Sequence, residues 1–199
     1  MYLLGYYLRL SEDLAGSSAV LSELTATYEN SFYRLGAWML LGHNHYDLSN
    51  YRKAMEAYSV VASVKENNDS YEDALYRLGW ASFEEFKYEQ AINSFLLLLD
   101  YGAESKGKQK QRLALRQEAI ESIANSFVDA DWDGDDLADA DYGPERALRY
   151  VSRGVSYEKE ILLAYANLLY DMDDVEHYRH AVVAFREYLK LDPLDPNAP

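Results

Sequence analysis

The chain contains the same four residues, Tyr-Arg-Leu-Gly, at positions 33–36 and again at 76–79. The segments that follow are also alike, because 51–58 and 88–95 both have the form Tyr-x-x-Ala-x-x-x-aromatic. A chain that resembles itself in this way builds an array of one small supersecondary unit, and this limits the fold more strongly than local propensity does. We therefore expect a repeat protein.

The composition indicates what kind of unit is repeated. Among 199 residues, 49% are hydrophobic and 27% are charged, which is ordinary for a folded globular chain and excludes wholesale disorder. Only 10 glycines and 4 prolines are present, too few for the many turns of an all-β fold. The sequence therefore predicts an all-α fold with short connections.

The charge balance restricts the partners. The chain has 34 acidic and 19 basic residues, a formal net charge of -15, so most of its surface would repel nucleic acids and anionic membranes. It contains no cysteine, which excludes disulfides and thiolate chemistry and leaves the compartment open. No window is long and apolar enough for a membrane-spanning helix, so we expect no direct membrane insertion.

Apolar residues with helical spacing predict helices at about 31–48, 51–64, 71–86 and 88–101. Ser70 and Asp73 have the spacing of a capping box at the start of the third of these. Gly36 and Ala54 would allow close helix crossing, since nearly absent side chains let two helices approach. We expect lengthened turns at 43–50, 102–111 and 129–143.

In the spacing of its small and aromatic residues, the chain resembles the tetratricopeptide repeat family. The best match is Leu75, Leu78, Gly79, Tyr88, Ala91, Phe95 and Leu98. Further matches are Ile120, Ile123, Ala124, Phe127, Ala147 and Val151, and then Leu162, Ala166, Tyr178, Ala181, Phe185, Tyr188 and Pro193. The resemblance implies a right-handed superhelical solenoid of antiparallel helix pairs, which acts as a protein-binding scaffold.

The resemblance covers nearly the whole chain as one repeat domain. Its units are expected at about 1–29 (partial), 31–66, 70–101, 113–156 with the acidic insertion 129–143, and 157–193. Both ends suggest an excised part of a larger protein, because a helical pattern is already running at Tyr2 and a turn leads onward at 192–196. The irregular spacing is similar to the bacterial envelope-associated branch of the family, of BamD-like or CpoB-like style or that of the large repeat proteins of gliding bacteria. This favours periplasm or cell envelope over cytoplasm.

In the family, the first helix of each pair lines a concave surface. The resemblance therefore implies a groove made of aromatic, small and acidic residues: Tyr33, Ala37, Leu40, Asp73, Tyr76, Trp80, Phe83, Glu84, Glu121 and Asn125. Tyrosine and tryptophan give large contact areas and dominate binding hot spots. We expect this groove to bind a protein or peptide that carries Lys or Arg beside apolar anchors. The alternative is that the aromatic rings simply pack between neighbouring units.

The insertion at 129–143 is the most acidic segment of the chain. Like charges so close together must be solvated or neutralised by a cation, and alternating carboxylates on a loop would allow several oxygens to converge on one calcium ion. Read from Asp129 the segment begins like an EF-hand loop, but Ala140 stands where the bidentate Glu belongs. Read from Asp131 it resembles thrombospondin type 3 calcium repeats. The candidate ligands are Asp129, Asp131, Asp133, Asp135 and Asp139.

The competing interpretation of this insertion is a solvated loop, or one that docks on a basic neighbour. The basic cluster of Lys106, Lys108, Lys110, Arg112 and Arg116 offers such a neighbour. Two histidine pairs occur, 43 with 45 and 177 with 180, and the second pair alone has a spacing that could share a helix face as metal ligands. That pair lacks an obvious third ligand, so the sequence favours a surface role for it over a zinc site.

No nucleophile motif or phosphate loop is visible, so we expect no enzyme. Three functions remain as hypotheses: a binding scaffold, a calcium-stabilised envelope module, and an accessory or regulatory region of a larger enzyme.

Overall fold

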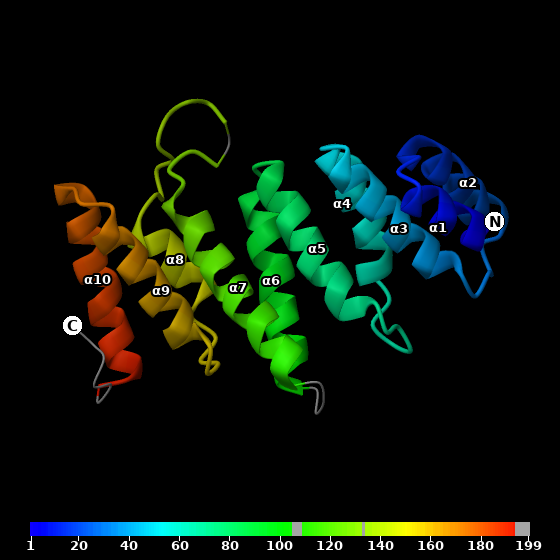
Figure 1. Ribbon diagram of the computed structural model, residues 1–199. Coiled ribbons are helices and arrows are strands. Elements are labelled where there is room, and N and C mark those ends of the chain that lie inside the picture. The colour runs from blue at the N-terminus through cyan, green and yellow to red at the C-terminus, as the bar shows by residue number, and fades with distance from the viewer. Residues whose placement is uncertain (105–108, 133, 194–199) are drawn as a thin grey trace. The chain divides into compact units, whose positions relative to one another are not determined.

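The computed structural model describes residues 1–104, 109–132 and 134–193, with side chains described outside 104–113. These described residues are all-helical, with ten helices and no strand (Figure 1). The helices are α1 (Tyr2–Leu10), α2 (Leu14–Thr27), α3 (Arg34–Asp47), α4 (Tyr51–Ala62), α5 (Tyr71–Glu84), α6 (Tyr88–Glu104), α7 (Gln109–Val128), α8 (Pro144–Tyr150), α9 (Glu158–Asp171) and α10 (Val175–Leu191). The expectation of an all-α chain is confirmed.

The chain divides into two compact parts, Met1–Leu98 and Leu99–Pro199, each of which we describe separately. In the N-terminal part consecutive helices pack on one another from α1 through α5. In the C-terminal part α9 packs on both α7 and α10. This packing of consecutive helices is compatible with a helical repeat.

One predicted turn is wrong. We expected both a helix over 31–48 and a lengthened turn at 43–50, and the helix forms: α3 ends at Asp47, with Leu48 as its C-cap residue. The reason is that residues in this stretch have buried partners. Asn44 is fully buried and donates to Ser17 Oγ at 2.8 Å, and His43 Nδ1 lies 2.9 Å from Tyr58 Oη. These contacts stabilise one more helical turn.

The predicted capping box at Ser70 is also wrong, because the Ser70 side chain makes no capping bond. Asn68 organises this connection instead. Its Nδ2 donates to the carbonyl oxygens of Val61 at 2.9 Å and Val64 at 2.7 Å, and its Oδ1 accepts from Ser70 N at 3.0 Å. The buried Asn68 side chain therefore bonds to carbonyl groups at the end of α4 and to a backbone N–H at the start of α5, and these bonds fix the path of the chain between the two helices.

The N-terminal part repeats with a step of 37 residues. Gly5, Gly42 and Gly79 are separated by this step, and each faces the side chain found sixteen residues further along the chain. A Cβ atom would lie 2.6 Å from Leu21 at Gly5, 2.3 Å from Tyr58 at Gly42, and 2.6 Å from Phe95 at Gly79. Glycine is needed at these three points because the crossing side chain occupies the space of a Cβ.

This step corrects the register of the first full unit. The repeated tetrapeptide equates Gly36 with Gly79, but the structural equivalent of Gly79 is Gly42, six residues later. Gly36 instead faces the ring of Tyr2. Tyr33 precedes α3, whereas Tyr76 lies inside α5, so the two tyrosines are not equivalent.

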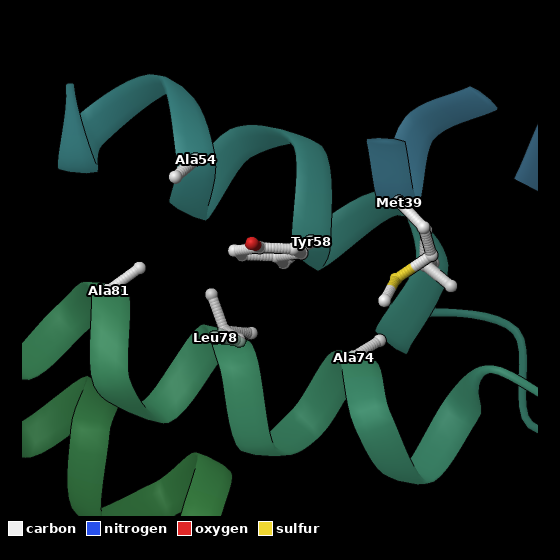
Figure 2. Close-up of a cluster of buried hydrophobic side chains, with 7 residues drawn as sticks. Met39, Ala54, Tyr58, Ala74, Leu78 and Ala81 are labelled. Carbon is white, nitrogen blue, oxygen red and sulfur yellow. The ribbon is translucent and has the colours of Figure 1, made fainter. Parts of the chain in front are cut away.

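A buried cluster joins α3, α4 and α5. Figure 2 shows the Tyr58 ring between α4 and α5, with Leu78 and Met39 directed toward it. Tyr58 is fully buried, and the small residues Ala54, Ala74 and Ala81 complete the cluster. Small residues beside one large ring allow the close approach that ridges-into-grooves packing needs.

Candidate functional site

Helix α5 presents a row of three aromatic rings. Tyr76, Trp80 and Phe83 follow one another at helical spacing and are all half-buried. The ring centroids of Tyr76 and Trp80 are 6.4 Å apart and those of Trp80 and Phe83 are 5.9 Å apart, in edge-to-face arrangements. Trp80 also contacts the buried ring of Phe95 at 6.1 Å. The row is therefore anchored from beneath while part of each ring stays accessible.

Charged residues flank this aromatic row. Asp73 and Glu84 are exposed on the same helix. Arg77 lies beside the row, with its Nε 3.4 Å from Asp73 Oδ1 and its guanidinium 5.7 Å from the Tyr76 ring centroid. The five predicted groove residues of α5 are thus brought together on one helix.

The 37-residue step identifies the residues of α3 that accompany this row. The equivalents of Trp80, Phe83 and Glu84 in α3 are His43, Tyr46 and Asp47. Arg9 of α1 joins them, since its guanidinium donates to Asn44 Oδ1 at 2.7 Å and to Asp47 Oδ2 at 2.6 Å.

Charged groups of α5 lie close enough to α3 to act on its titratable side chains. Burial lowers the pKa of His43, and the Arg77 guanidinium lowers it further. Burial also raises the pKa of Tyr46, and the Glu84 carboxylate adds to that shift. We name this surface the α1–α3–α5 face. Its members are Arg9, His43, Tyr46, Asp47, Asp73, Tyr76, Arg77, Trp80, Phe83 and Glu84.

The predicted groove residues near α3 lie elsewhere. Ala37 is fully buried, and Leu40 is half-buried against the cluster around Leu21, so neither extends the aromatic row. Tyr33 stacks on the ring of Tyr2 with centroids 5.1 Å apart. These three were placed by the tetrapeptide register, which is wrong. The signal that finds the α3 members instead is the spacing of Gly5, Gly42 and Gly79.

The other two predicted groove residues belong to α7 in the C-terminal part. Glu121 and Asn125 are both exposed there, and Glu121 accepts a hydrogen bond from Gln117 at 2.7 Å. They share one helix face at i, i+4 spacing.

The acidic insertion is folded around a buried arginine. Arg146 of α8 is fully buried, and its guanidinium donates to Asp139 Oδ2 at 2.6 Å, Asp141 Oδ1 at 2.9 Å and the Asp129 carbonyl at 2.7 Å. The same guanidinium lies 4.2 Å from the ring centroid of Trp132. The Arg146 hydrogen bond holds the pKa of the Asp141 carboxyl below its ordinary value. The insertion, drawn as the long loop between α7 and α8 in Figure 1, thus docks on a basic neighbour.

Of the predicted basic cluster, the side chain of Arg116 alone is described, and it contacts another element. Arg116 forms a two-pronged ion pair with Glu160 of α9, one bond of which measures 2.6 Å. Lys106 and Lys108 lie outside the described residues, as do the side chains of Lys110 and Arg112. Arg146 was not predicted because nothing in its sequence neighbourhood distinguishes a buried arginine from an exposed one.

The candidate calcium ligands have other partners. Asp131 accepts from the backbone N–H groups of Gly134, Asp135 and Asp136, and Asp135 accepts from Leu137 N at 2.9 Å. Asp129 Oδ1 accepts from Asp131 N at 3.0 Å. Asp139 Oδ2 accepts from Trp132 N at 2.9 Å as well as from Arg146.

Asp133, the remaining candidate ligand, lies outside the described residues. Across the described part of the chain, no three His, Asp or Glu side chains converge as a metal site would require.

The second histidine pair belongs to the start of α10. His177 Nδ1 contacts Asp174, the N-cap residue of that helix, and His177 Nε2 lies 3.1 Å from Tyr142 Oη. His180 packs its ring against Tyr142 with centroids 5.5 Å apart. The pair therefore ties the end of the insertion to α10.

Comparison with protein-family models finds no match, and comparison with curated proteins finds none either. Within the described residues, no helix is both long enough and apolar enough to cross a bilayer.

Proposed function

We propose that the chain is a tetratricopeptide-like scaffold, a right-handed solenoid whose α1–α3–α5 face binds a segment of another protein. The observation that carries the proposal is the row of Tyr76, Trp80 and Phe83 with exposed carboxylates at both ends, Asp73 and Glu84. Anchored, partly accessible aromatic rings supply contact area at low entropic cost.

The charges of the face define the chemistry of the ligand. Arg9 and Arg77 are each already paired with a carboxylate of the face, Asp47 and Asp73 respectively. Glu84 is exposed at the end of α5. The face has three carboxylates and two arginines, so the Glu84 carboxylate gives it one surplus negative charge, and a segment with Lys or Arg beside apolar anchors complements that charge. Such charge complementarity raises association rates and excludes acidic competitors.

We expect the face to select basic, apolar peptides. The full chain is used to select binders from a random peptide library, and the dissociation constant of the best binder is measured by fluorescence anisotropy. The double variant Tyr76→Ala with Glu84→Gln should raise that constant by at least about tenfold, because it removes one anchor ring and the surplus rim charge.

The matched control is Tyr28→Ala with Glu66→Gln, which removes the same groups at exposed positions outside the face. It should leave the dissociation constant unchanged. Selected peptides without basic residues, or equal affinity for both double variants, would contradict the proposal. Far-UV circular dichroism confirms that each variant remains helical.

Calcium binding by the insertion stays a hypothesis of a different class. An ion there would take Asp131 from its backbone N–H donors and Asp139 from Arg146. If the hypothesis holds, millimolar calcium raises the midpoint of thermal unfolding and Asp131→Asn removes the rise. No shift and no heat of binding at millimolar calcium would reject it.

Two wider hypotheses accompany the scaffold proposal. The first is that the protein is located in the bacterial periplasm or cell envelope, because the irregular spacing of its repeats is similar to that of the envelope-associated branch of the family. A role as the regulatory region of a larger enzyme is the other alternative, and a catalytic motif in sequence adjoining this chain would support it.

A further inference from the structure

Helices α9 and α10 enclose an apolar groove that no described helix fills. Its volume is about 770 Å³, and a second hollow of about 370 Å³ adjoins it on α10. We name it the α9–α10 groove; its lining residues are Asn167, Tyr170, Tyr178, Ala181, Val182, Phe185, Arg186 and Leu189. Tyr170 is 60% exposed and Val182 is 48% exposed. Large apolar side chains in a concave site mark a binding surface.

The N-terminal part shows what fills such a groove. Each of α4 and α10 carries a fully buried alanine followed four residues later by an aromatic ring, Ala54 with Tyr58 and Ala181 with Phe185. On α4 these residues are covered by the next helix, α5, whose Leu78 packs on Tyr58 (Figure 2). The α9–α10 groove is therefore shaped for an amphipathic helix.

A charge accompanies this packing. Arg52, two residues before Ala54, reaches Glu85 at the end of α5 with an N–O distance of 3.3 Å. Arg179 occupies the same place relative to Ala181 and lines the adjoining hollow. Within the described residues neither Arg179 nor Arg186 has an acidic partner. The helix that fills the α9–α10 groove should therefore carry a carboxylate near its C-terminal end.

Helix α1 has the features of such an occupant. The 37-residue step relates Leu4, Leu41 and Leu78. Leu41 is buried in the cluster that contains Leu21 of α2, and Leu78 is buried in the cluster that contains Tyr58 of α4. Leu4, by contrast, is 54% exposed. Tyr7 is 63% exposed, and the exposed carboxylate of Glu12 follows the end of α1.

We propose that α1 of one copy of the chain docks into the α9–α10 groove of a second copy. Leu4 and Tyr7 then cover Phe185 and Val182, and Glu12 approaches Arg179. The two surfaces differ, so the contact is heterologous and adds copies head to tail. This inference is independent of the α1–α3–α5 face.

The test is sedimentation velocity of the full chain from about 10 to 500 µM, a range suited to an interface of modest size. The average mass should rise with concentration. Leu4→Asp and Val182→Asp should each weaken self-association by at least about tenfold, since each places an unpaired carboxylate in the apolar contact. Leu97→Asp, at an exposed leucine of α6, should have no effect.

Mixing the two variants distinguishes the contact between α1 and the α9–α10 groove from other modes of self-association. The Leu4→Asp variant keeps an intact α9–α10 groove, and the Val182→Asp variant keeps an intact α1. An equimolar mixture should therefore form 1:1 dimers and nothing longer. A monomeric wild-type chain at the highest concentration, self-association that both variants retain, or a mixture that stays monomeric would each overturn the proposal.

Discussion

Replacing Arg146 by Ala lowers the free energy of unfolding of the C-terminal part by about 3 to 5 kcal/mol. The guanidinium is fully buried and holds together Asp139, Asp141 and the Asp129 carbonyl. Without it, the carboxylates of Asp139 and Asp141 and the carbonyl of Asp129 each lose a hydrogen bond from a charged donor, and the space of a fully buried side chain is left empty. Urea unfolding is the measurement, followed by circular dichroism and by the fluorescence of Trp132, whose ring covers the guanidinium.

Two variants serve as controls for Arg146→Ala. Arg149 also contacts Asp141, but its side chain is 59% exposed, so Arg149→Ala should cost less than about 1 kcal/mol. Arg146→Lys keeps the charge and loses the forked geometry, so its cost should lie between the two. If Arg146→Ala is no more costly than Arg149→Ala, the insertion is not organised by the buried arginine.

Replacing Gly42 by Ala lowers the stability of the N-terminal part by about 1 to 3 kcal/mol, despite the better helix propensity of alanine. The new Cβ would lie 2.3 Å from a ring carbon of Tyr58. That ring is fully buried in the cluster that contains Met39 and Leu78 (Figure 2), so it must displace packed side chains to make room. Gly79→Ala, against Phe95, should behave alike. Denaturant unfolding measures both.

Gly36→Ala is the matched control for this prediction. Its Cβ would lie 3.1 Å from the ring of Tyr2, which is half-buried and can shift. We therefore expect a change within about 0.5 kcal/mol, or a small gain from helix propensity. If Gly36→Ala proves more costly than Gly42→Ala, the tetrapeptide register is right and the 37-residue step is not the structural repeat.

The helices of the first hundred residues were predictable because apolar residues recur there with helical spacing. Predicted and observed bounds for α4, α5 and α6 agree to within a few residues. The row of Tyr76, Trp80 and Phe83 was predictable for the same reason, since i, i+4 and i+7 positions share one face of any helix.

The register of α3 was not predictable from local similarity. Tyr-Arg-Leu-Gly occurs twice, but the first copy straddles the start of α3 and the second lies within α5. The structural equivalent of Gly79 is the glycine of α3 that contacts a ring from the following helix, and that glycine is Gly42. That contact lies outside the four residues that look alike.

The sequence by itself determined that this chain is all-helical, that consecutive helices pair, and that its most acidic segment interrupts the helices between residues 129 and 143. These features depend on local periodicity and composition. Only the tertiary structure decided that Gly42 rather than Gly36 repeats Gly79, and that the insertion is held by hydrogen bonds to a buried Arg146. Both depend on contacts between helices, which are set by side-chain volume and charge across the fold and leave no local pattern in the chain.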